Sequence, residues 1–169
     1  LHRVDRRQRQ MCIRDSTHTQ GTLDVETERY LELLEKDKKY TIGAFKDFAK
    51  TIESQKGSLR KTLAQFKEQN KTIYAYGAPA KGNTLLNYFG IDKALVDKAV
   101  EINELKIGTY LPQSHIPITR EDKADLPDYY LLLSHNFAEE IIKKNQDIIH
   151  QGVKFIIPFP NIRIVENEN

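Results

Sequence analysis

Residues 73–86 read IYAYGAPAKGNTLL, and this stretch decides the fold. An apolar run enters a turn of glycine, alanine and proline, and the chain leaves the turn through Lys-Gly-Asn-Thr into a leucine-rich helical pattern. The order of strand, tight turn and helix N-terminus is typical of open α/β sheets, in which such a turn holds a phosphate or a nucleotide. We therefore predict a ligand-binding turn that begins at Gly77.

Short apolar runs alternate with helical patterns downstream of this turn, which indicates βαβ units and a parallel sheet. The predicted fold is α/β: a Rossmann-like, mostly parallel five-stranded sheet flanked by helices and preceded by a long amphipathic N-terminal helix. We expect strands at 72–76, 98–102, 115–118, 129–134 and 153–158, and helices at 81–88 and 136–151 among others.

The long helix is predicted over residues 41–69, because its apolar side chains recur every three or four residues. We expect it to cover one face of the sheet. A coiled-coil partner helix is the alternative, although the regular heptads are few. The apolar positions are Ile42, Phe45, Phe48, Ile52, Leu59, Leu63 and Phe66.

Charge is unevenly distributed along the 169 residues, whose net charge is +2. Five arginines and two aspartates give residues 1–16 a charge of +3, and the rest of the chain carries −1. A basic arm for nucleic acid or a membrane is one interpretation, but this segment has no aromatic residue for base stacking and no apolar face. Residues 9–16 resemble translated sequencing-adapter read-through. We therefore treat residues 1–16 as a non-native or disordered tail, and the start at Leu1 suggests a truncated reading frame.

Composition argues against several classes of protein. No run is apolar over the roughly 18 residues of a membrane-spanning helix. The single cysteine, Cys12, excludes an internal disulfide framework and a zinc cluster built on cysteines. The histidines at 18, 115, 135 and 150 show no spacing typical of metal ligands. We predict a cytoplasmic protein with no membrane, nucleic-acid or metal partner.

The turn has the spacing of the dinucleotide fingerprint G-x-G-x-x-G, with a proline at the middle position. Gly77 permits the tight turn and Gly82 permits close packing of helix on strand, but Pro79 adds bulk and removes an N–H where a pyrophosphate would approach. The P-loop interpretation fails because Lys81 precedes Gly82. What remains is a helix N-terminus with Lys81, Asn83 and Thr84, which suits an anion or a sugar hydroxyl; a well-packed turn with capping residues is the alternative.

Further polar residues are candidates for ligand contact. Glu101 ends the second strand, where an acid binds a ribose in dinucleotide folds; a solvated surface acid is the alternative. His115, in the loop that feeds the third strand, suits a phosphate contact or a base, but a structural histidine is the simpler reading because no carboxylate or nucleophile accompanies it. His135 and Asn136 follow the fourth strand, at the edge where parallel strands line a ligand crevice, and Asn136 is also a good N-cap for the next helix.

These motifs together resemble the C-terminal domain of S-adenosylmethionine-dependent sugar C-methyltransferases. The resemblance covers about residues 41–164, and residues 17–23 are similar to the last strand of the preceding methyltransferase domain. Glu101 stands where the family often has Asp, Gln113 replaces Gly, and His135 replaces Trp. The motifs that carry the resemblance are Gly77–Leu86, Lys106-Ile107-Gly108, Leu111-Pro112-Gln113, His115-Ile116-Pro117-Ile118, His135-Asn136 and Pro158-Phe159-Pro160.

The resemblance implies a three-part enzyme that methylates a carbon beside the keto group of a nucleotide-linked deoxysugar. It places a zinc-binding part, and then an S-adenosylmethionine domain that holds the general base, before this domain. We therefore assign the chain no catalytic residue, no metal and no bound cofactor, and we expect it to transfer no methyl group alone. Its expected partners are the nucleotide-linked sugar and the missing N-terminal domains.

The resemblance also divides the chain. We expect a remnant of the preceding domain and a linker helix at 17–40, the Rossmann-like domain at 41–165 and a frayed tail at 166–169. The predicted substrate-binding residues are Gly77, Ala78, Lys81, Gly82, Asn83, Thr84, Glu101, His115, His135 and Asn136. Two alternatives stay open: a stand-alone nucleotide-binding or oxidoreductase-like domain, against which Pro79 argues, and a non-catalytic interaction module that uses the helix at 41–69.

Overall fold

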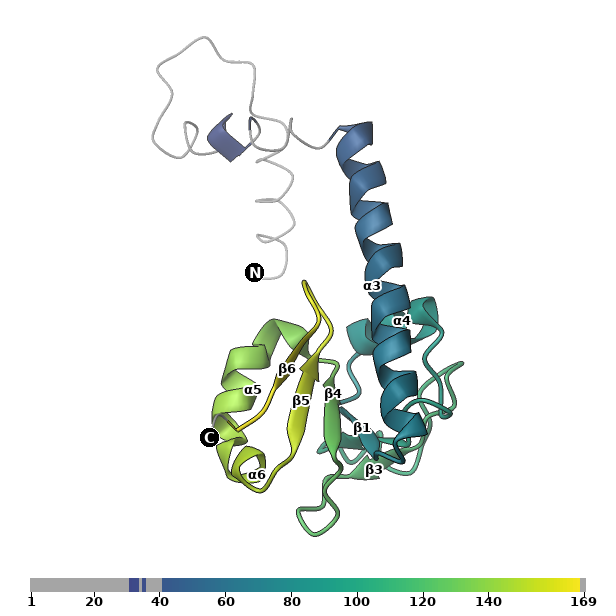
Figure 1. Ribbon diagram of the computed structural model, residues 1–169, viewed down its shortest axis with the longest axis vertical. Helices are drawn as coiled ribbons and strands as arrows, with labels where there is room; N and C mark the ends of the chain where they lie inside the picture. The colour runs from purple at the N-terminus through teal and green to yellow at the C-terminus, as the bar shows by residue number, and fades with distance from the viewer. Residues whose placement is uncertain (1–30, 34, 36–40, 168–169) are drawn as a thin grey trace, which may run out of the picture. The chain divides into compact units, whose positions relative to one another are not determined.

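The structure is a computed structural model that describes residues 31–33, 35 and 41–167 (Figure 1). The chain divides into two units, residues 1–46 and residues 47–169. In the first unit residues 31–33 and 35 are helical. The tail expected at 1–16 and most of the remnant expected at 17–40 lie outside the described residues.

The second unit holds a six-stranded sheet with the strand order β3-β2-β1-β4-β5-β6. The first five strands of this order pair in parallel, and β6 is antiparallel to β5. The predicted α/β class with a mostly parallel sheet is therefore confirmed. The strands are β1 (Ile73–Tyr76), β2 (Lys98–Glu101), β3 (Ile118–Arg120), β4 (Tyr129–Leu132), β5 (Lys154–Ile157) and β6 (Arg163–Val165). The helices are α3 (Ile42–Glu68), α4 (Ala80–Phe89), the 3₁₀ helix η1 (His135–Phe137), α5 (Ala138–Lys144) and α6 (Gln146–His150).

Strand β6 corrects the expected count of five. It pairs Arg163 with Ile157 and Ile164 with Ile156, so the chain turns back directly after β5. Two prolines in the connection, Pro158 and Pro160, make it look like the end of the sheet. A three-residue edge strand with mostly exposed side chains carries almost no periodic signal, which is why its sequence does not predict a strand.

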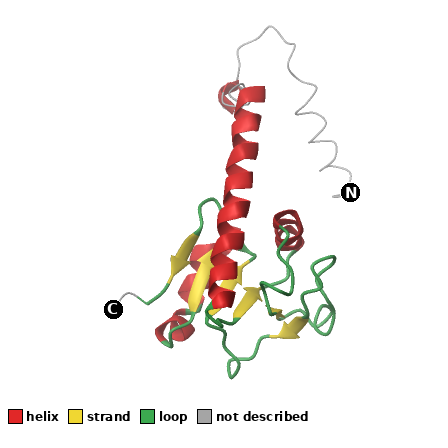
Figure 2. Cartoon of the chain, turned by 45° about the vertical axis from the view of Figure 1, so that its right-hand side comes forward, coloured by secondary structure: helices red, strands yellow, loops and turns green. Residues whose placement is uncertain are grey.

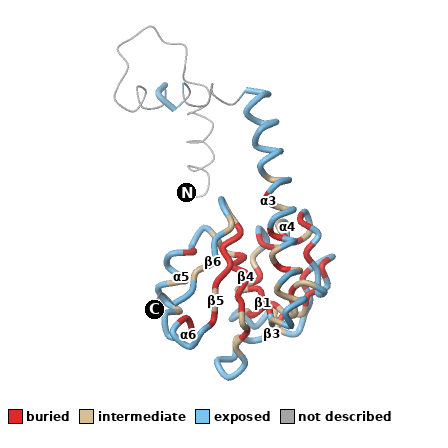
Figure 3. The backbone as a smooth tube through the Cα atoms, viewed as in Figure 1, coloured by how far each residue is buried: buried red, intermediate tan, exposed pale blue. Residues whose placement is uncertain are grey.

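Helices cover both faces of the sheet (Figures 1 and 2). Leu59 and Leu63 of α3 and Leu86 of α4 are fully buried in the cluster on one face. The cluster on the other face includes Ile148 and Ile149 of α6. All four residues of β4 are buried, as expected for a central strand covered on both sides (Figure 3).

Helix α3 runs unbroken from Ile42 to Glu68, close to the predicted 41–69. Its C-terminal half covers the sheet as predicted: Leu59 and Leu63 are buried, and the Phe66 ring stacks on Tyr129 with 4.0 Å between centroids. Its N-terminal half is different, because the apolar side chain of Phe48 is 59% exposed (Figure 3). No helix among the described residues is long and apolar enough to cross a membrane.

The helix expected at 136–151 is divided into three short pieces. Asn145 breaks it between α5 and α6, with backbone angles φ −112° and ψ 23°. Its side-chain Nδ2 donates to the Ile141 carbonyl (2.8 Å) and to the Tyr76 hydroxyl (3.2 Å), so it competes with the regular helix ladder. The capping role predicted for Asn136 is wrong, because Asn136 lies inside η1 and Phe137 is the N-cap of α5.

Candidate functional site

The β1–α4 turn lies at the carboxyl edge of the parallel strands. Gly77 adopts φ +80°, a backbone conformation that favours glycine, and its N–H donates to the Val100 carbonyl (2.9 Å). Pro79 is the N-cap of α4, and the first helical hydrogen bond runs from the Asn83 N–H to the Pro79 carbonyl (3.1 Å). The N–H groups of residues 80–82 therefore precede the helical ladder and have no intrahelical acceptor.

Gly82 allows α4 to approach β4 closely. A Cβ atom at this position would lie 2.6 Å from the Cβ of Leu133, well inside van der Waals contact. The packing role predicted for Gly82 is therefore confirmed. Its contact with a ligand stays a prediction, as it does for Ala78, which is buried.

The side chains of the first turn of α4 differ in their availability. Lys81 is exposed. The Thr84 hydroxyl donates to the Ala80 carbonyl (3.2 Å), which leaves its oxygen as an acceptor. The Asn83 Oδ1 atom is buried and has no hydrogen-bond partner within residues 41–167. Lys81 is thus the side chain of this turn best placed to meet an anion from solvent.

The carboxylate of Glu101 already accepts four hydrogen bonds from within the chain. Its carboxylate accepts hydrogen bonds from the N–H groups of Ala78 (3.2 Å), Ile102 (2.9 Å) and Asn103 (3.2 Å), and from the Lys106 ammonium (3.2 Å). Burial alone would raise the pKa of Glu101, but these bonds lower it below its ordinary value. The carboxylate stays ionised and has little capacity left for a ribose hydroxyl. Glu101 is placed at the predicted edge, but its chemistry there is structural.

His135 and Asn136 lie beside the turn. The position of a Cβ on Gly77 would be 3.4 Å from Ser134 Oγ, so the residues that follow β4 and the turn that follows β1 are neighbours. Burial lowers the pKa of His135, the backbone of Leu133 opposes this shift, and the charge of Lys81 lowers the pKa further. These effects together favour the neutral imidazole of His135 over the imidazolium.

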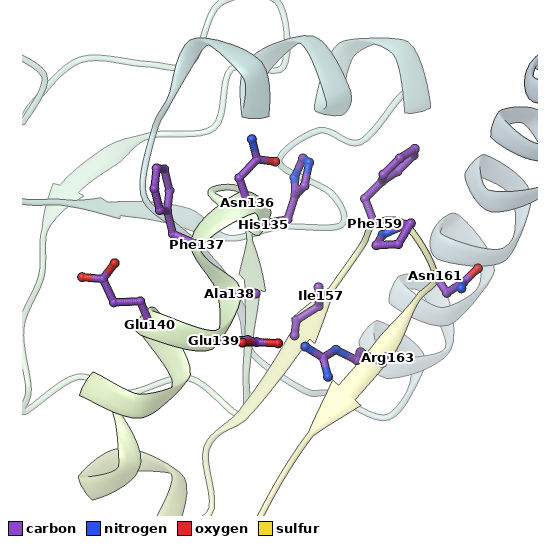
Figure 4. A pocket seen from close by; sticks show the side chains of 11 residues that line it. His135, Asn136, Phe137, Ala138, Glu139, Glu140, Ile157, Phe159, Asn161 and Arg163 are labelled. Atoms are coloured by element: carbon purple, nitrogen blue, oxygen red, sulfur yellow. The ribbon is translucent and has the colours of Figure 1, made fainter. Parts of the chain in front are cut away.

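An open pocket of about 720 Å³ adjoins these residues (Figure 4). His135 and Asn136 form one wall, and Phe159 and Arg163, which lie on either side of the β5–β6 turn, form another. The rings of His135 and Phe159 are in contact, with centroids 5.7 Å apart. Because Arg163 pairs with Ile157 at the carboxyl end of β5, the pocket opens on the same edge as the β1–α4 turn.

Three further residues at this edge were not predicted as site residues: Lys106, Phe159 and Arg163. Lys106 stands in the Lys-x-Gly motif, and Arg163 is one of four arginines after Arg14, so the sequence marks both residues as unusual. The sequence does not show that the fold brings these residues to the carboxyl edge of the sheet. Lys106 reaches back to the turn from a loop, and Arg163 reaches the edge only because β6 reverses direction.

His115 is not brought together with the other candidates. It precedes β3, with φ +54°, and therefore lies at the amino edge of the sheet. There it lines a second pocket of about 550 Å³ with Lys93 and Tyr110. The structure places nine of the ten predicted residues on one edge and His115 at the other. Among the described residues, no group of three or more histidine, cysteine or acidic side chains is arranged to hold a metal.

The chain also matches a known protein family. The family model described as "C-methyltransferase C-terminal domain" matches residues 10–160. The chain belongs to this family. The match begins upstream of residue 41 and includes part of the segment set aside as a tail, so the domain boundaries above stay predictions.

Two relatives extend the comparison. The chain is 35% identical over 127 residues to the C-methyltransferase NovU of Streptomyces niveus, an alignment that covers 74% of this chain and 30% of NovU. It is 23% identical over 172 residues to the uncharacterized protein MJ1441 of Methanocaldococcus jannaschii, which covers 88% of this chain and 14% of that protein. The chain thus spans less than a third of either relative. The family match therefore establishes that this chain contains a domain found in C-methyltransferases.

Proposed function

We propose that this chain is the substrate-binding domain of a C-methyltransferase that acts on a nucleotide-linked keto-deoxysugar. The observation that carries the proposal is the shared carboxyl edge: Lys81, at the N-terminus of α4, interacts with His135, and His135 lines a pocket together with Asn136 and Arg163. Lys81 and Arg163 supply positive charge for a diphosphate. Aromatic rings and the asparagine side chain supply stacking and hydrogen bonds for a base or a sugar.

The methyl donor of the whole enzyme is proposed to be S-adenosylmethionine, bound outside the described residues. The residues described here do not fit its ribose, because Glu101, at the position of the ribose-binding acid, already accepts four hydrogen bonds. The same observation argues against NAD, as does Pro79, which offers no N–H to a pyrophosphate. We therefore place the catalytic groups in the remainder of the enzyme. We also propose that the reaction takes place in the cytoplasm.

Calorimetric titration of the 169-residue chain with dTDP, NAD and S-adenosylmethionine tests this function. We expect saturable binding of dTDP and none of the other two. Binding of NAD without dTDP would favour an oxidoreductase-like domain and would refute the proposal. Binding of S-adenosylmethionine would place the donor site in this chain and would refute the division of labour.

A further inference from the structure

Lys106 and Glu101 hold the two peptide groups on either side of Ala78. Lys106 Nζ donates to the Ala78 carbonyl (2.9 Å) and to Glu101 Oε2 (3.2 Å), and the same Oε2 accepts the Ala78 N–H (3.2 Å). The pair therefore ties the β1–α4 turn to the β2–β3 connection. These contacts use the acid and the Lys-x-Gly motif that the proposed function leaves unexplained.

The turn depends on such outside support. Gly77 adopts φ +80°, and Pro79 makes no side-chain capping bond to α4 within the described residues. The backbone of residues 78–79 thus lacks the capping interactions that usually fix a helix start. Ala78 itself is 6% exposed, so Lys106 and Glu101 hold a buried residue close to the N-terminus of α4.

The local sequence explains how Lys106 arrives there. Two turns, closed by bonds from the Lys106 N–H to the Asn103 carbonyl (3.0 Å) and from the Thr109 N–H to the Lys106 carbonyl (3.1 Å), fold the connection back over the edge. Gly108, at φ +83°, then redirects the chain, and its N–H donates to the Ile118 carbonyl (2.9 Å). The Lys-x-Gly spacing therefore places the Lys106 side chain at the β1–α4 turn and directs the chain towards β3.

We propose that Lys106 and Glu101 form a positioning pair that fixes the β1–α4 turn for its anionic ligand. The inference rests on the proposed function for the identity of that ligand. The Lys106 side chain is 40% exposed and the Glu101 side chain 12% exposed, and neither side chain belongs to the hydrophobic core. Breaking the pair should therefore loosen the turn far more than it lowers global stability. Because the pair is neutral, it leaves the positive charges of Lys81 and Arg163 to meet the ligand.

The test combines amide exchange, dTDP affinity and thermal unfolding in Lys106→Met, Glu101→Gln and the double variant. Lys106→Met keeps most of the aliphatic stem and removes the ammonium. Lys123→Met is the matched control, because it removes an equally simple surface pair, Lys123–Asp147 (3.1 Å), that does not contact the turn. Lys106→Arg keeps the charge and reports whether a cation suffices.

We expect faster exchange of the Ala78 amide and dTDP binding weakened at least about fivefold in Lys106→Met, with nonadditive effects in the double variant. Lys106→Arg should recover part of the affinity, and Lys123→Met should match the parent. Unchanged exchange at Ala78, or a loosened turn with unchanged dTDP affinity, would overturn the proposal. Global unfolding of both single variants would also overturn it, since the pair would then serve the fold as a whole. If the parent binds no dTDP while the variants still loosen the turn, the proposed function fails, and the support of the turn by the positioning pair stands.

Discussion

Replacing Gly82 with alanine tests the contact that places α4 on the sheet. The new Cβ would lie 2.6 Å from Leu133 Cβ, 3.0 Å from Leu133 Cδ1 and 3.2 Å from Leu133 Cγ. Leu133 Cβ is attached directly to the backbone, so a rotamer change of Leu133 does not remove the shortest contact. Relief requires that α4 move away from β4 by about 1 Å, given that carbon atoms pack at about 3.5–4.0 Å.

Two opposing effects set the size of the change. Overpacking of a close contact costs about 1–3 kcal/mol. Replacing glycine by alanine inside a helix returns about 0.5–1 kcal/mol. Gly82→Ala should therefore lower the free energy of unfolding by up to about 2.5 kcal/mol, because the difference between these two effects lies between about 0 and 2.5 kcal/mol.

Gly57→Ala provides the matched control, because a Cβ at this position in α3 meets no atom within 4 Å. It carries the helix-propensity gain without the clash, so it should stabilise the chain by about 0.5–1 kcal/mol. Urea unfolding followed by circular dichroism measures both variants. If Gly82→Ala is as stable as Gly57→Ala, the close approach of α4 to β4 is refuted.

Three further predictions concern the edge, the pH dependence and the activity. Lys81→Ala should weaken dTDP binding about tenfold, which corresponds to about 1.4 kcal/mol, without changing the unfolding midpoint; equal affinity measured by calorimetry would count against ligand binding at the β1–α4 turn. Burial alone would raise the pKa of Asp128, but hydrogen bonds from Thr72 and Lys71 lower it below 3.8. Asp128 therefore contributes fully to the free energy of unfolding above pH 3.8, and this contribution is lost as the pH falls through the lower pKa of the folded state. Asp128→Asn should accordingly cost about 1 kcal/mol at pH 7, a value reduced for solvent exposure, and less at pH 3, as urea midpoints at the two pH values would show. Assayed alone with S-adenosylmethionine and a nucleotide-linked keto-sugar, the chain should transfer no methyl group, and measured turnover would contradict this.

The elements with strong periodicity were predictable from the sequence. Helix α3 and the buried runs of β4 and β5 gave long or strongly apolar patterns, and their observed bounds lie close to those expected. Gly82 was also predictable, because the fingerprint spacing states its packing role directly. In each case the signal is local, and burial of the apolar residues reinforces it.

Other features depend on contacts that sequence order hides. The position of Glu101 in the sequence predicts a ribose ligand, but its carboxylate accepts hydrogen bonds from Lys106 and from the Ala78 N–H. Asn145 breaks a helix through a bond to Tyr76, which lies 69 residues away along the chain. His115 precedes β3, which begins at Ile118, so the histidine lies at the amino edge of the parallel sheet, opposite the β1–α4 turn.

Mapping of dTDP on the isotope-labelled chain by amide chemical shifts tests the central claim most directly. We expect dTDP to shift the amide signals of residues 77–84 and 134–136 and to leave those of residues 110–117 unchanged. Shifts confined to residues 110–117, or no shifts at saturating dTDP, would contradict the claim that the carboxyl edge of this domain holds the nucleotide-linked sugar.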